Sequence, residues 1–77
     1  MYDDILSGFC KSCLSKQVNS QSTVEDTILT ALRCGENNNA IGGSFILLGA
    51  VATLENEGGC QKCISVLRRV VGALQQS

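Results

Sequence analysis

Two pairs of cysteines are the residues in this sequence whose type and spacing could do chemistry. Cys10 and Cys13 form one Cys-x-x-Cys pair near the start of the chain, and Cys60 and Cys63 form a second pair near its end. Thiolates bind zinc and iron–sulfur clusters, and neighbouring thiols can also form disulfides. The four cysteines therefore predict either a metal site or a pair of disulfides.

The spacing of the cysteines leaves these two alternatives open. In the first, Cys10, Cys13, Cys60 and Cys63 are all ligands of one zinc ion or of an iron–sulfur cluster. In the second, two antiparallel helices face each other and are joined by the disulfides Cys10–Cys63 and Cys13–Cys60. The fifth cysteine, Cys34, then remains free or joins two chains.

Catalysis by these thiols is a weaker interpretation. A thiol beside Lys62 at a helix N-terminus has its thiolate form favoured, but the strand–helix–strand pattern of thioredoxin-like proteins is missing. The chain has no histidine, which excludes serine–histidine and cysteine–histidine catalysis and mixed cysteine–histidine zinc sites. Free cysteine is also a common core residue. We expect a protein that is not an enzyme, with zinc as the candidate cofactor.

Length and charge limit the fold and the partners. The chain of 77 residues is expected to form a single domain, residues 1–77, with a core small enough to need staples or a partner chain. A net charge of -1 gives no electrostatic attraction to nucleic acid, and an aromatic content of 4% removes stacking platforms for bases. Nucleic acid is therefore not the expected partner.

Helical periodicity predicts an all-α fold, a small four-helix domain with adjacent N- and C-terminal helices. The predicted helices span residues 2–18, 23–33, 40–54 and 60–75. Ser22 or Thr23 is expected to cap the second helix, with Ser22 and Glu25 at capping-box spacing, and Gly35 to end it. The apolar stripe of the last helix is predicted to consist of Cys60, Cys63, Leu67, Val70 and Leu74.

Each cysteine pair is predicted to lie on the buried face of a terminal helix. If those helices pack side by side, the four thiols can meet. The clamp formed by Cys10, Cys13, Cys60 and Cys63 would then join the two ends of the chain.

Residues 40–54 are the least polar segment, and at this length they fall short of the roughly 20 residues that span a bilayer. They favour a central helix that is buried on most sides or covered by a second subunit. The alternative is a membrane-active or oligomer-forming segment in which Gly42, Gly43, Gly49 and Ala50 permit close approach. The expected interaction residues are Phe45, Leu47, Leu48 and Val51.

These features favour a small interaction or regulatory protein that forms homo-oligomers. Asp3 and Asp4, rather than basic residues, stand near the N-terminus, so no secretory signal is recognised and a cytoplasmic location is expected. The alternative is a secreted, disulfide-stapled peptide that disturbs membranes through residues 40–54. A third hypothesis is a DNA-binding regulator, because residues 27–58 weakly resemble a winged helix. However, residues 51–57 contain no lysine or arginine to contact phosphates.

Overall fold

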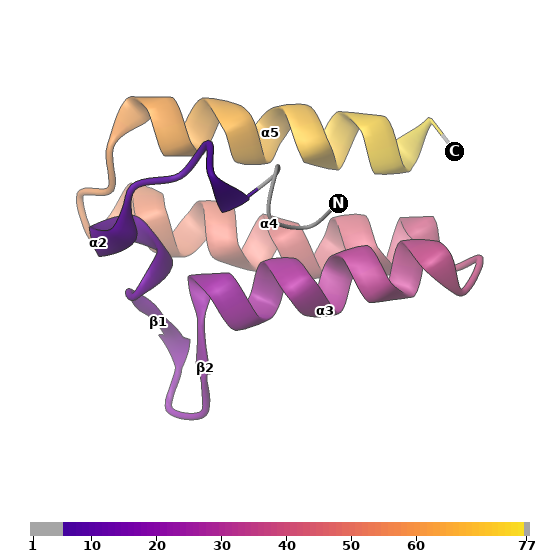
Figure 1. The fold of residues 1–77 in the computed structure, drawn as a ribbon, viewed down its shortest axis with the longest axis horizontal. Coiled ribbons are helices and arrows are strands. Elements are labelled where there is room, and N and C mark those ends of the chain that lie inside the picture. Colours follow the sequence, from indigo (N-terminus) through magenta and orange to yellow (C-terminus); the bar gives the residue numbers. More distant parts are fainter. Residues whose placement is uncertain (1–5, 77) are drawn as a thin grey trace.

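The computed structural model describes residues 6–76. These residues form a short helix and a small hairpin, followed by three longer helices (Figure 1). The elements are α2 (Lys11–Leu14), β1 (Gln17–Asn19), β2 (Ser22–Thr23), α3 (Val24–Glu36), α4 (Ala40–Asn56) and α5 (Gln61–Gln75). The prediction of a mostly helical fold is confirmed, but the two-stranded sheet was not predicted.

The central element is α4, which packs against α3 on one side and α5 on the other. Its core positions Leu47, Ala50 and Leu54 are completely buried. Near its start, α4 comes so close to α3 that a Cβ on Gly43 would lie 2.6 Å from the carbonyl oxygen of Ala31. A glycine is therefore needed at this crossing. The prediction of a central helix at residues 40–54 is confirmed, and the helix continues to Asn56.

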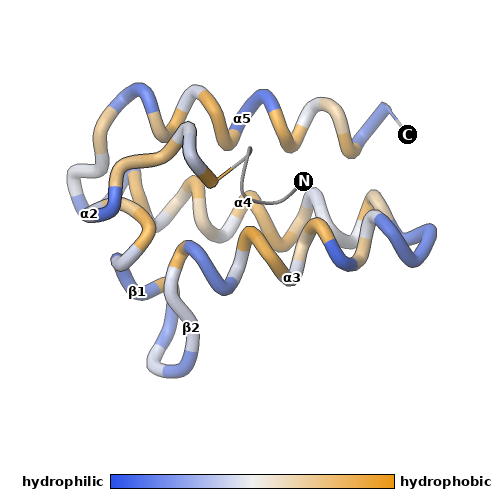
Figure 2. The backbone as a smooth tube through the Cα atoms, in the orientation of Figure 1, coloured by the Kyte–Doolittle hydropathy of each residue, from blue (hydrophilic) through white to orange (hydrophobic). Residues whose placement is uncertain are grey.

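Helices α3 and α5 are amphipathic and cover two sides of α4, and hydrophobic and hydrophilic residues alternate along both (Figure 2). The predicted stripe of α5 is partly wrong. Val70 and Leu74 are only half-buried, and Val71 is buried instead, because the face of α5 that meets α4 is rotated slightly from the predicted one. The buried residues of α5 are Cys63, Ile64, Leu67 and Val71.

The predicted first helix, residues 2–18, is largely wrong within the described residues, and residues 2–5 lie outside them. Helix α2 covers only Lys11–Leu14, and β1 follows at residues 17–19. The Asn19 side chain accepts a hydrogen bond from the backbone N–H of Gln21 at 2.8 Å. This bond lies just beyond the predicted end of the helix and favours the turn that folds β2 back onto β1. The last residues of the predicted helix therefore pair as a strand.

The start of α3 agrees with one of the two predicted caps, whereas its end lies later than predicted. Thr23, one of the two predicted caps, is the N-cap and forms a reciprocal capping box with Asp26. The predicted capping box of Ser22 and Glu25 is therefore one residue too early. Gly35 does not end the helix, which continues to Glu36. Asn38 adopts the left-handed conformation instead, with φ of 63°, and turns the chain into α4.

Candidate metal centre

The turn between α4 and α5 positions Cys60, the first cysteine of the second motif. Gly58 has φ of 75°, and the backbone N–H of Gly59 donates to the carbonyl oxygen of Leu54 at 2.6 Å. This is the Schellman arrangement that ends helices at a glycine. A Cβ on Gly59 would lie 2.8 Å from the Cβ of Leu54, so this turn fits against the core only with glycine at position 59. Both glycines therefore fix the approach of Cys60.

The two Cys-x-x-Cys motifs adopt the same local structure. Cys10 is the N-cap of α2, with φ of -80° and ψ of 150°, and Cys60 is the N-cap of α5, with φ of -74° and ψ of 147°. The carbonyl of each accepts a backbone hydrogen bond of 3.1 Å, from Leu14 and Ile64 respectively. The prediction that all four thiols lie on buried helix faces is therefore wrong for Cys10 and Cys60, which are exposed.

The four thiols meet at one end of the molecule, where α2 lies beside the turn that leads into α5 (Figure 1). All four Sγ atoms lie within 4.8 Å of one another. The Sγ of Cys10 is 3.7 Å from that of Cys63 and 3.8 Å from that of Cys60, and the Sγ atoms of Cys13 and Cys60 are also 3.8 Å apart. The sequence prediction that the two pairs can meet is confirmed.

These distances distinguish the two predicted states of the cysteines. A disulfide needs an S–S distance of about 2.05 Å, and all five cysteines are free, so neither predicted disulfide, Cys10–Cys63 or Cys13–Cys60, is present. In a tetrahedral site with zinc–sulfur bonds of about 2.3 Å, neighbouring sulfurs are separated by about 3.8 Å. Three sulfur pairs have this separation, and the cluster therefore has the dimensions of a site for one metal ion.

Within each motif the second thiol is buried and the first is exposed. Removal from water raises the pKa of Cys63 to about 12 and also raises the pKa of Cys13, because burial disfavours the thiolate. Hydrogen bonds from the Cys13 side chain and backbone, and from Ser12, lower the pKa of Cys10 to about 6. Without a metal, the exposed thiol of Cys10 is therefore the one that most readily carries the negative charge.

Hydrogen-bonding groups lie beside two of the four sulfurs. The backbone N–H of Cys10 donates to the Sγ of Cys63 at 3.3 Å, across the two motifs, and the hydroxyl of Ser12 lies 3.7 Å from the Sγ of Cys10. Each motif also carries one exposed lysine, Lys11 or Lys62. Four thiolates around a divalent ion would carry two net negative charges, a state that positive side chains within the motifs would favour.

The predicted interaction residues separate into two groups. Leu47 and Val51 lie in the core with exposed fractions of 0% and 3%, so the prediction that they form a surface is wrong. They face inward because α4 is covered on two sides. Phe45 and Leu48 are exposed, and Ile41 joins them. Ile41 was not predicted, although its spacing of four residues from Phe45 would have indicated the same face.

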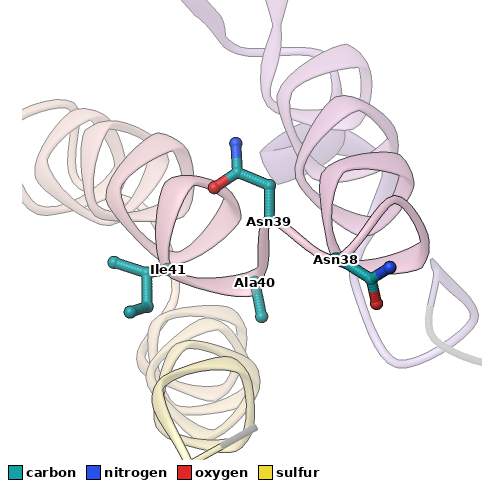
Figure 3. A pocket seen from close by; sticks show the side chains of 5 residues that line it. Asn38, Asn39, Ala40 and Ile41 are labelled. Carbon is teal, nitrogen blue, oxygen red and sulfur yellow. The ribbon is translucent and has the colours of Figure 1, made fainter.

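Two other features of the described residues lie outside the thiol cluster. Cys34 lies on α3 and is not part of the thiol cluster. A pocket of about 260 Å³ at the turn between α3 and α4 is lined by Gly35, Asn38, Asn39, Ala40 and Ile41 (Figure 3). None of these side chains is an acid, a base or a nucleophile. The Asn39 side chain is already used to cap α4, where it accepts from the N–H of Gly42 at 3.2 Å.

The length and hydropathy of the described helices indicate whether any of them could span a bilayer. Over residues 6–76, no helix has both the length and the apolar character required to cross a membrane. Helix α4, the least polar of them, has 17 residues.

Comparison with known proteins gives no relative: no protein-family model, curated protein or solved structure matches this chain. The functional argument therefore depends on the geometry of the thiol cluster and on the exposed surface of the helices.

Proposed function

We propose that this chain is a small, non-catalytic interaction protein that binds one zinc ion through Cys10, Cys13, Cys60 and Cys63. The separation of the sulfurs, 3.7 to 3.8 Å for three pairs, is the observation that supports this proposal. Four thiolates would complete a tetrahedral shell and leave no open position for water or substrate, which is typical of structural rather than catalytic zinc sites.

The ion would act as a clamp between the two ends of the chain. Helix α2 has only four residues, far fewer than an isolated helix needs to be stable in water. Zinc bound to Cys10 and Cys13 would hold this helix against the start of α5, which supplies Cys60 and Cys63. In this way the N-terminal and C-terminal helices would become adjacent parts of one rigid unit.

The proposed location is a reducing compartment such as the cytoplasm, where thiols persist and are available to a metal. The free state of all five cysteines agrees with this location. A role as an interaction or regulatory protein agrees with the large apolar side chains that remain exposed on α4.

Native mass spectrometry combined with thiol alkylation tests this proposal. We expect the native mass to exceed that of the chain by one zinc ion, and all five cysteines to react with an alkylating reagent once the zinc is removed. Cys34→Ser is the matched control, because it removes a thiol outside the cluster and should leave zinc binding unchanged. Four cysteines that resist alkylation until they are reduced would contradict the proposal and would favour the disulfide-stapled secreted peptide.

A further inference from the structure

Helix α4 carries an exposed apolar face that the metal centre does not use. Among residues 6–76, the large hydrophobic side chains with substantial exposure are Ile41 at 64%, Phe45 at 66% and Leu48 at 42%. Their spacing of four and three residues places them on one side of the helix. Gly49 and Ala52 are also exposed on this side. We call these five residues the α4 outer face.

The outer face is also free of charge. From Ala40 to Leu54 the helix contains no acidic or basic residue, and the first charge, Glu55, is paired with Arg68 of α5 at 2.7 Å. The face therefore offers a partner neither ion pairs nor the cations that attract acidic membranes or nucleic acid. The partner that this face can bind is therefore an apolar surface of matching shape.

The order of large and small residues along this face makes it complementary to itself. The N-terminal half carries the bulky Ile41 and Phe45, and the C-terminal half carries the small Gly49 and Ala52, with Leu48 near the middle. In a twofold-symmetric antiparallel pair, each residue meets its counterpart from the opposite half. Phe45 would meet Gly49 of the second copy, Ile41 would meet Ala52, and the two Leu48 side chains would meet near the axis.

We propose that two copies of this chain form a symmetric dimer through antiparallel packing of their α4 outer faces. A second copy would be the partner of the interaction protein proposed above. The dimer nevertheless stands on a different observation from the metal site. Because Phe45 would fill the space over Gly49 of the other chain, each copy supplies both a knob and a notch to the same interface.

The size of this surface indicates a weak dimer. One exposed face of a helix of 17 residues, about 25 Å long, provides less than the roughly 800 Å² per partner that standard interfaces bury. We therefore expect a dissociation constant on the order of 10 to 100 μM.

Analytical ultracentrifugation of the zinc-loaded chain tests the dimer, with the zinc content measured on the same sample. The mass should rise from the 8.1 kDa of one chain towards twice that value as concentration increases. A chain that carries one zinc ion but remains monomeric at about 500 μM would overturn the dimer and leave the metal site intact. So would larger, open-ended assemblies, or a monomer that binds phosphatidylcholine–phosphatidylglycerol vesicles.

Substitution of Gly49 tests the interface itself. An added Cβ at Gly49 meets no atom within 4 Å, so Gly49→Leu fits the single chain and replaces a residue that weakens helices. We expect Gly49→Leu to raise the thermal midpoint of the monomer but to weaken dimerisation at least about tenfold, because it fills the notch. The matched control is Gly72→Leu on α5, where an added Cβ also meets no atom within 4 Å. If Gly49→Leu and Gly72→Leu had the same dissociation constant for the dimer, the proposed packing would be wrong.

Phe45→Gln provides a second, independent variant. Phe45 is 66% exposed, so its replacement should leave the folded chain intact while removing the largest apolar contact of the dimer. Dimerisation should again fall at least about tenfold. An unchanged dissociation constant would place the dimer contact on another surface and contradict the proposal.

Discussion

The two cysteine motifs share one local structure, but the rest of the protein holds them in place to different degrees. The motif of Cys60 and Cys63 opens a helix of 15 residues that packs along α4, whereas the motif of Cys10 and Cys13 opens a helix of four residues. The first is positioned by the core and by the turn at Gly58 and Gly59, and the second by a few side chains such as Phe9. The two motifs can therefore depend on the metal to different degrees for their position in the fold.

This difference predicts what zinc would do for the fold. Helix α5 contributes buried residues such as Leu67 and Val71 whether or not a metal is bound. Helix α2 contributes only Cys13 to the buried set, so most of its order would come from coordination. We therefore expect the metal to stabilise the N-terminal part of the chain more than the helical hairpin formed by α4 and α5.

Removal of zinc by a chelator should have the largest effect. Amide exchange at residues 10–15 should accelerate at least about tenfold, because α2 is too short to persist without coordination, whereas protection of the core amides of α5 should change little. Hydrogen exchange read by NMR or mass spectrometry measures both regions in one sample. Equal loss of protection in α2 and α5 would show that the metal supports both motifs alike.

Replacement of a ligand tests whether the motifs are equivalent towards the metal. Cys10→Ser and Cys60→Ser each remove one exposed thiol, and both should weaken zinc binding by at least about 100-fold, since even residues that only support a metal ligand contribute 10- to 100-fold. Competition with a chromophoric chelator measures the affinities. Because both thiols are exposed, the metal-free variants should unfold at the same temperature as the metal-free parent. A variant that keeps its full affinity would exclude the replaced cysteine as a ligand.

Acid should weaken zinc binding, because protons compete for the thiolates. The raised pKa of Cys13 and of Cys63 means that both are protonated in the metal-free protein at pH 7, so both must lose a proton when zinc binds. With at least two protons released, affinity should rise at least about 100-fold for each unit increase in pH near neutrality. Calorimetry in buffers of different ionisation enthalpy counts these protons. Zero release would contradict coordination by the buried pair.

A smaller effect is expected from Gly59→Ala, which disturbs only the C-terminal motif. The new Cβ would lie 2.8 Å from the Cβ of Leu54, and overpacking of this kind costs about 1 to 3 kcal/mol of unfolding free energy. Displacement of Cys60 should also weaken zinc binding by about tenfold. Gly72→Ala is the control, because its Cβ meets no atom within 4 Å. Equal denaturant midpoints for the two variants would show that Gly59 is not required for this turn.

Much of the hairpin of helices could be predicted from sequence because its signals are local. The apolar segment from Ala40, the glycine pair at Gly58 and Gly59, and the periodicity after Cys60 place α4 and α5 nearly correctly. The first helix could not be placed this way, because an apolar period of three to four residues ran through a segment that instead forms α2 and β1. Residues 17–19 pair with β2 instead, and helical periodicity carries no information about a strand partner.

The candidate site was predicted in its residues but not in its form. Two Cys-x-x-Cys pairs indicated a shared site, yet their period alone placed Cys10 and Cys60 on buried faces. In the structure both are N-caps, which puts the first thiol of each pair at the surface and the second in the core. The sequence also could not predict that Leu47 and Val51 face the core. Helix α4 has apolar residues on all sides, so its sequence pattern does not indicate which side is covered.

X-ray absorption at the zinc edge would test the central claim, coordination of one zinc ion by four thiolates, most directly. We predict a first shell of four sulfur atoms at about 2.3 Å, with no nitrogen or oxygen ligand and one zinc ion per chain. A shell that contains oxygen or nitrogen, a second metal atom nearby, or less than one zinc ion per chain in fully reduced protein would contradict it.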